Sequence, residues 1–396
     1  MRPDGREPSV PVRAYLDYGG FAPADPRVLA VMRPFLEGGV GNPAASHSLG
    51  HEAKESLEAA RSKVARFVGG TASGVIFTSG ATEANNLAIK GVVLRSGEGG
   101  GHVVSSAVEH ISVLNSYREL EKRGFEVTYL PVDGEGRVDP EALVRAIRKN
   151  TVLVSIQAAN PETGTVQPTA ALGRLSKELG VHFHVDAVGA AGRVSLAVDE
   201  HGIDLLTLSG NDLYGPPGVG ALWVRAGVKL LPQIVGGGQE RGYRSGTENL
   251  PAIVGMGVAA ELARQEGREE ARRLAGLRDR LLQGLSELPD CLLTGSRTHR
   301  LPHHASACVP GVKSDSLLMD LDLHGIVASS GSACSSMTRE PSHVLRAIGL
   351  GPEESEGSLC FTLGRWTAPQ EVDAVLTILP SIVSRLRALA PPRSAR

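Results

Sequence analysis

Short apolar runs recur between residues 75 and 224 and alternate with longer segments of mixed polarity. Strands of a parallel sheet are covered by helices on both faces, so they appear as nearly continuous apolar runs. The longer segments have the length of helices, which favours repeated βα units and a mostly parallel seven-stranded sheet between helices. The predicted strands are residues 75–77, 102–104, 127–130, 152–156, 183–185, 205–208 and 220–224.

Helical spacing is clearest in residues 53–67, where Leu57, Ala60, Val64 and Phe67 recur every three to four positions before a Gly-Gly pair. A second helical pattern, rich in Arg and Glu, covers residues 257–286. We therefore expect a large domain over residues 14–260 and a smaller α+β domain over 261–390. The N-terminal segment is expected to pack near the small domain.

The composition and net charge of the chain limit the kinds of molecule that it is expected to bind. The chain has 396 residues, 41% of them hydrophobic, which is enough for two domains with buried cores. Its net charge of −2, with both signs interspersed, indicates neither a nucleic acid partner nor an anionic membrane surface. No apolar run approaches the roughly 20 residues of a membrane span, and the polar first residues lack the apolar core of a signal peptide. A cytoplasmic location is expected.

The four cysteines are widely spaced and form no CxxC pair, which argues against a disulfide scaffold or an all-protein zinc site. Cys291 and Cys308 are expected to fill cores as small apolar residues. Cys334 differs, because the small polar residues of SSGSACSS (329–336) predict an accessible, oxidisable thiol. The His303-His304 pair lacks further ligands at metal spacing and is expected in a surface loop.

Three motifs follow predicted strands. TSGATEANN (78–86) places Ala81 and Thr82 where a helix begins, a position that binds phosphate but is also explained by a simple helix cap. Asp186 in HVDA (184–187) ends a buried strand, where its carboxylate could pair with a protonated pyridine nitrogen. His110 in AVEHISV (107–113) could stack on a flat ring. No single motif identifies the function.

Taken together, the motifs resemble the NifS/IscS-type cysteine desulfurases, pyridoxal phosphate (PLP) enzymes of fold type I and of aminotransferase class V. The resemblance covers roughly residues 14–388. The matching segments are GNPAASHSLG (41–50), TSGATEANN (78–86), VEH (108–110), ETGTVQP (162–168), HVDA (184–187), YGPPGVGALWVR (214–225), GGGQERGYRSGTEN (236–249) and SSGSACSS (329–336).

This resemblance implies a homodimer. It implies a phosphate site that uses Ala81, Thr82 and Ser209, with a threonine, Thr247, contributed by the partner subunit. His110 would lie over the cofactor ring and act in catalysis, and Asp186 would face the pyridine nitrogen. Cys334 matches the catalytic cysteine on a mobile loop, which takes sulfur from cysteine as a persulfide and passes it to an IscU-like scaffold protein of iron–sulfur cluster assembly.

The chain departs from the family pattern around the expected cofactor. The family's SxHKxYGP is here Ser209 to Pro216, with Asn211-Asp212 in place of His-Lys. A carboxylate cannot form an imine with an aldehyde, nor can it replace the lysine amine in proton transfer. Three further family residues are substituted, an asparagine and a glutamine expected beside the ring and an arginine expected to hold the substrate carboxylate. Their positions are Pro161, Gly189 and Cys360.

None of the eight lysines lies in a motif expected to face the cofactor, so a substitute lysine is not expected. The substitutions cluster at cofactor and substrate contacts, whereas the cysteine loop and RSGT (244–247) are intact. This distribution of substitutions indicates selection for a different function rather than random loss of the family's residues.

The sequence favours a desulfurase-like protein of iron–sulfur cluster assembly that lacks covalent PLP. Cys334 would deliver persulfide sulfur or ligate a [2Fe–2S] cluster shared with the scaffold. One alternative is an active cysteine desulfurase, converting L-cysteine to L-alanine and an enzyme persulfide, with PLP held noncovalently. Another is a catalytically silent scaffold or regulatory dimer, which would have no need of Cys334.

Overall fold

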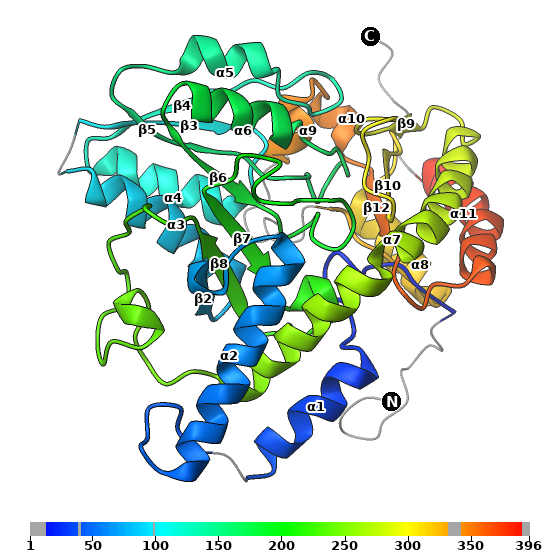
Figure 1. The fold of residues 1–396 in the computed structure, drawn as a ribbon. Coiled ribbons are helices and arrows are strands. Elements are labelled where there is room, and N and C mark those ends of the chain that lie inside the picture. Colours follow the sequence, from blue (N-terminus) through cyan, green and yellow to red (C-terminus); the bar gives the residue numbers. More distant parts are fainter. Residues whose placement is uncertain (1–12, 39–40, 98–99, 332–341, 390–396) are drawn as a thin grey trace.

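The computed structural model describes residues 13–38, 41–97, 100–331 and 342–389. Its centre is a seven-stranded sheet in the order β2-β8-β7-β6-β5-β3-β4 (Figure 1). All neighbours in this sheet pair in parallel except β8, which is antiparallel to both β2 and β7. The mostly parallel seven-stranded sheet predicted from the sequence is therefore confirmed. Its strands are β2 (Val75–Thr78), β3 (His102–Ser106), β4 (Glu126–Leu130), β5 (Thr151–Ser155), β6 (His182–Asp186), β7 (Leu205–Ser209) and β8 (Gly220–Val224).

Helices cover both faces of this sheet because successive strand residues point to opposite sides. Ile76 and Val103 pack in a core with residues of α3 and α4, whereas their neighbours Val75 and Val104 pack in a second core with residues of α2 and α7. Because a layer of helices packs on each side, both faces of the large sheet are apolar. The helices of this part are α1 (Pro26–Leu36), α2 (Ser48–Val68), α3 (Ala81–Arg95), α4 (Ile111–Lys122), α5 (Pro140–Ala146), α6 (Thr169–Glu178) and α7 (Leu250–Ser286).

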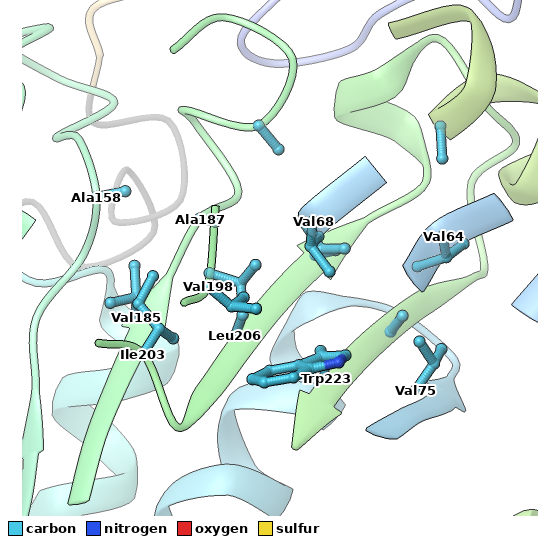
Figure 2. Close-up of a cluster of buried hydrophobic side chains, with 14 of the residues drawn as sticks. Val64, Val68, Val75, Ala158, Val185, Ala187, Val198, Ile203, Leu206 and Trp223 are labelled. Atoms are coloured by element: carbon cyan, nitrogen blue, oxygen red, sulfur yellow. The ribbon is translucent and has the colours of Figure 1, made fainter. Parts of the chain in front are cut away.

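The helix predicted over residues 53–67 lies within α2, which begins five residues earlier and ends one residue later. His47 caps its first turn by accepting a hydrogen bond from the Gly50 amide (3.2 Å), and Gly69 ends it in the left-handed conformation at φ 70°. Val64 and Val68 point into the core beside Trp223 of β8 (Figure 2). Burying a valine side chain contributes about 1.5 kcal/mol or more to folding.

A smaller layer lies at the far end of α7 (Figure 1), where β10 pairs with β9 and β12 in an antiparallel sheet. The N-terminal strand β1 (Ala14–Tyr15) pairs with β11 (Ile326–Val327) of this layer. The expected C-terminal α+β domain is confirmed. Its other elements are β9 (Leu292–Leu293), β10 (His304–Cys308), α8 (Ser314–Leu323), α9 (His343–Ala347), α10 (Pro352–Ser355), β12 (Ser358–Thr362) and α11 (Pro369–Leu389).

The long helix α7 joins the two parts without a break. Its first half, including Met256 and Ala260, packs in the core of the large sheet, and its second half, including Leu274 and Leu281, packs in the core of the small layer. A domain boundary at residues 260/261 would fall inside this helix and stays a prediction. Within the described segments, no helix is both long enough and apolar enough to cross a membrane.

A buried ion pair ties the segment after β8 to the large sheet. Arg61 of α2 and Glu240 of η3 (Glu240–Gly242) are both buried, and their side chains form two hydrogen bonds of 2.7 and 2.8 Å. Glu240 also accepts a hydrogen bond from the Phe77 amide (2.9 Å). Removing one partner of such a pair leaves the other charge buried and unpaired.

Glu240→Gln should therefore lower the free energy of unfolding by about 3 kcal/mol, because it leaves the buried Arg61 charge without its buried partner. The matched control is Glu58→Gln, since Glu58 contacts the same guanidinium at 3.1 Å but is 53% exposed. That change should cost less than about 1 kcal/mol. Urea denaturation of the three proteins measures both effects, and equal losses would contradict the assigned difference in burial.

Candidate active-site cavity

A cavity of about 220 Å³ lies where the carboxyl ends of the parallel strands meet the small layer. Open α/β sheets bind ligands at this edge, because loops from several strands converge there. The predicted site residues that line it are Ala81, Thr82, His110, Pro161, Asp186, Gly189, Asp212 and Cys360.

Asp186 is the last residue of β6 and is held in place from α3. Its carboxylate accepts hydrogen bonds from Asn85 Nδ2 (2.7 Å) and from the Val188 amide (3.1 Å). Asn85 also donates to Ser112 Oγ (3.0 Å). The resulting arrangement presents a buried, oriented acceptor to the cavity, which suits a protonated ring nitrogen.

His110 is the N-cap of α4, and its ring is oriented by the first turn of that helix. Nδ1 lies 2.8 Å from Ser112 Oγ and accepts from the Ser112 amide (3.2 Å). Ala81 and Thr82 begin α3, so amide groups at a helix N-terminus face this side of the cavity. These residues can hold a flat ring and a phosphate group.

Asp212 lies in η2 (Asn211–Leu213), directly after β7, and its side chain is partly buried in the cavity wall. Burial raises the pKa of its carboxyl group to about 6, and the charge of Asp186 acts in the same direction. A hydrogen bond with Ser209 and the charge of Arg193 oppose this rise. The carboxyl group therefore lies in an environment that disfavours its negative charge.

Arg193 also lines the cavity, and neighbouring side chains hold its guanidinium group in place. Its guanidinium contacts Glu270 Oε1 (2.6 Å), donates to Tyr214 Oη (2.6 Å) and stacks on the Tyr214 ring at 4.7 Å. Arg365 stacks on the same ring at 4.7 Å and pairs with Glu270 (2.9 Å). Because Nη1 and Nη2 each already bind a partner, Arg193 is less available to bind an anionic ligand.

The cavity does not fit PLP, the group that the resemblance implies, in its aldehyde form. All eight lysines lie in the described part of the chain, and none of them lines the cavity. Lys90, on α3, forms an ion pair with Glu119. Asp186, His110 and the start of α3 could hold the ring and phosphate, but no described lining residue offers the aldehyde an amine with which to form an imine.

On the small-layer side, Cys360 occupies the position expected for an arginine. Its Sγ lies 3.1 Å from His304 Nε2, which is also 2.9 Å from the Pro161 carbonyl oxygen. Burial raises the pKa of the Cys360 thiol and lowers that of His304 to about 3. Both groups are therefore neutral at physiological pH, and neither provides a positive charge for a substrate carboxylate.

The expectation that His303 and His304 form a surface loop is wrong. Both are buried, and both line the cavity, because β10 begins at His304 and forms the middle strand of the small sheet. The dipeptide lacks helical or strand periodicity of its own, and its burial depends on pairing with β12.

Three acidic residues of the cavity, Asp17, Glu109 and Glu162, were not predicted as site residues from the sequence, and the two glutamates are buried. Burial raises the pKa of Glu162 to about 7, and its Oε1 has no hydrogen-bond partner among the described residues. Burial raises the pKa of Glu109 to about 8, although its carboxylate accepts from the Gln157 amide (2.9 Å). Both lie in quoted motifs, VEH and ETGTVQP, and a search for charged residues within those motifs could have found them.

Three predicted site residues lie elsewhere, and a fourth falls outside the described residues. Ser209 and Asn211 flank the cavity wall without lining it, and Asn211 Oδ1 is buried without a partner in the described structure. Thr247 is exposed and does not line the cavity of its own chain. Cys334 is outside the described residues. Among the described residues, no group of three His, Cys, Asp or Glu side chains is arranged to hold a metal ion.

Comparison with known proteins identifies the family. The family model for aminotransferase class-V matches residues 14–375. The chain is 46% identical over 377 residues to cysteine desulfurase IscS 1 of Archaeoglobus fulgidus, covering 95% of this chain and 98% of that protein. It is also 46% identical over 378 residues to cysteine desulfurase IscS of Dictyoglomus turgidum, covering 95% and 96%.

Comparison with solved structures identifies the same family. A NifS-like protein superposes with a TM-score of 0.89 at 35% identity, covering 94% of this chain and 100% of the other. A NifS-like protein from Rickettsia africae superposes with a TM-score of 0.83 at 31% identity, covering 94% and 99%. The chain belongs to the PLP-dependent aminotransferase class-V family, and within it to the NifS/IscS-type cysteine desulfurases.

Proposed function

We propose that this chain delivers sulfur in iron–sulfur cluster assembly through Cys334, as a homodimer working with an IscU-like scaffold protein and without covalently bound PLP. The observation that carries the proposal is the presence of Asp212, and the absence of any lysine, in the wall of the family's cofactor cavity. A protein of this family without that lysine lacks the amine on which self-sufficient PLP chemistry depends.

Sulfur transfer through Cys334 needs no PLP if a donor persulfide is available. The Cys334 thiolate attacks the outer sulfur of the donor persulfide, the donor S–S bond breaks, and the donor leaves as a thiolate. A scaffold cysteine then attacks the outer sulfur on Cys334 in the same way. Each step exchanges one S–S bond for another, so no oxidant is required. As a thiolate, Cys334 could also ligate a [2Fe–2S] cluster shared with the scaffold.

The first test of this proposal concerns the cofactor. With one equivalent of PLP followed by borohydride, no lysine of the purified protein should become labelled, because none lines the cavity. Peptide mass spectrometry provides the measurement, and the positive control is a family member with the usual lysine. Stoichiometric labelling of any one lysine would contradict the claim that PLP is not covalently bound.

The second test separates sulfur delivery from cysteine desulfuration. With L-cysteine and free PLP, the chain should release no L-alanine above the level of PLP alone. With iron, a donor persulfide, the scaffold and a thiol reductant that supplies the two electrons converting each persulfide sulfur to sulfide, it should support cluster formation. Alanine release that requires this chain would instead establish a desulfurase with noncovalent PLP, an alternative favoured by the retained positions of Asp186 and His110.

A further inference from the structure

The described wall of the cavity is rich in carboxyl groups and poor in cations. Arg193 is the one described lining residue with a permanent positive charge, and Glu270 and Tyr214 already bind it. Burial lowers the pKa values of His303, His304 and His343, so these imidazoles are neutral at physiological pH. The acidic lining residues are Asp17, Glu109, Glu162, Asp186 and Asp212.

Four buried side-chain polar atoms in this wall lack a partner among the described residues: Asn85 Oδ1, Glu162 Oε1 and the Nδ1 atoms of His303 and His304. Asn85 is 1% exposed; its Nδ2 donates to Asp186 (2.7 Å), which fixes the amide orientation, and its Oδ1 has no partner. Glu162 is 7% exposed, and its Oε1 has no partner either. Buried polar atoms are nearly always hydrogen-bonded, so unpaired acceptors in a cavity wall indicate a ligand that brings N–H or O–H donors.

Asp212 gives this donor requirement a position. It lies just after β7, whereas Asp186 is the last residue of the adjacent strand β6, and the charge of Asp186 raises the pKa of Asp212. An aldehyde or a carboxylate next to Asp212 would meet an acceptor or a like charge. An ammonium group would donate a charge-assisted hydrogen bond and stabilise the ionised carboxylate.

We propose that the cavity binds the amine form of the cofactor, pyridoxamine 5′-phosphate, with its ammonium group paired with Asp212, in preference to the aldehyde form. This deepens the proposed function, because it rests on the same absence of a lysine. Asp186 and His110 would hold the ring. Asp212 would favour a ligand with an ammonium substituent over one with an aldehyde.

Three ligands that differ in one substituent test the proposal directly: pyridoxamine 5′-phosphate with an ammonium, pyridoxine 5′-phosphate with a hydroxyl and PLP with an aldehyde. Isothermal titration calorimetry of the wild-type dimer should show the ammonium ligand binding at least about tenfold more tightly than the other two, the scale of one charge-assisted pair. Equal affinities, tightest binding of PLP, or no binding of the ammonium ligand would overturn the proposal.

Variants then assign the preference to one residue. Asp212→Asn, which keeps the size and removes the charge, should weaken the ammonium ligand about tenfold and leave the hydroxyl ligand unchanged, whereas Asp212→Glu should retain the preference. The matched control is Asp186→Asn, which should weaken all three ligands by a similar factor and leave their ratio unchanged. An unchanged ratio in Asp212→Asn would refute the pairing.

The titration also separates this inference from the proposed function. Cys334→Ser should leave all three affinities unchanged, because the titration involves no sulfur transfer. If the ammonium preference is present and cluster assembly fails, the sulfur-delivery proposal is wrong and the cavity assignment stands. If cluster assembly succeeds and the ammonium preference is absent, the cavity assignment is wrong and the sulfur-delivery proposal stands.

Discussion

Replacing Cys334 with serine should reduce cluster formation on the scaffold to the level measured without this chain, while folding and dimerisation remain unchanged. A serine hydroxyl does not accept persulfide sulfur and does not replace a thiolate as an iron ligand. The measurement is visible absorbance during anaerobic assembly from iron, a donor persulfide and a thiol reductant that converts persulfide sulfur to sulfide, with wild type and Cys334→Ser side by side.

The other three cysteines cannot replace Cys334. Cys308 and Cys360 are buried in the small sheet, and Cys291 is partly buried. Burial raises the pKa of Cys291 to about 11 and of Cys308 to about 12, and it raises the pKa of Cys360 as well. These thiols stay protonated near pH 7, and a protonated thiol is a poor nucleophile and ligand.

The controls are Cys291→Ala and Cys308→Ala, which should keep full cluster formation. Cys308→Ala should lower the free energy of unfolding by about 1 kcal/mol or more, because it leaves a small cavity in a packed core. Equal cluster yields from wild type and Cys334→Ser would remove the need for this thiol and would establish the silent-scaffold alternative.

Asp212→Lys should restore covalent PLP attachment and yet leave cysteine turnover at least about a hundredfold below that of an IscS-type relative. The new amine would replace a side chain that already lines the cavity beside Asp186, so an imine can form. Turnover also requires the substrate to be held in a reactive position, and a misplacement of about 1 Å can cost a factor of about 100. Absorbance, borohydride labelling and alanine release measure the two properties separately.

The carboxylate contact is the decisive missing part. Cys360 is neutral and His304 next to it is neutral, so the substrate carboxylate meets no positive charge on that side. Asp212→Lys combined with Cys360→Arg should therefore raise turnover above that of Asp212→Lys alone. Turnover close to that of relatives in the single variant would show that Pro161, Gly189, Asn211 and Cys360 matter less than we infer.

Much of the fold follows from local signals. All seven strands of the large sheet were predicted within about two residues, because each contains a short apolar run; six are largely buried between helices, and only the edge strand β4 is half-exposed. The helix over residues 53–67 was also predicted, although α2 begins five residues earlier, at Ser48. The capping interaction of His47 explains the difference, since histidine at an N-cap is not among the residues that ordinarily signal a helix start.

The order and type of these elements and the family motifs can be obtained from the sequence alone, because each depends on neighbouring residues, whereas the place of Asp212 at the family's lysine position stays a prediction from the motif. The tertiary structure decided which side chains share the cavity. Glu162 and His304 are more than 140 positions apart, and they line the same wall only because β10 pairs with β12 beneath the carboxyl ends of the large sheet. Burial there sets their neutral or weakly acidic character, since the penalty for a charge depends on surroundings assembled from distant parts of the chain.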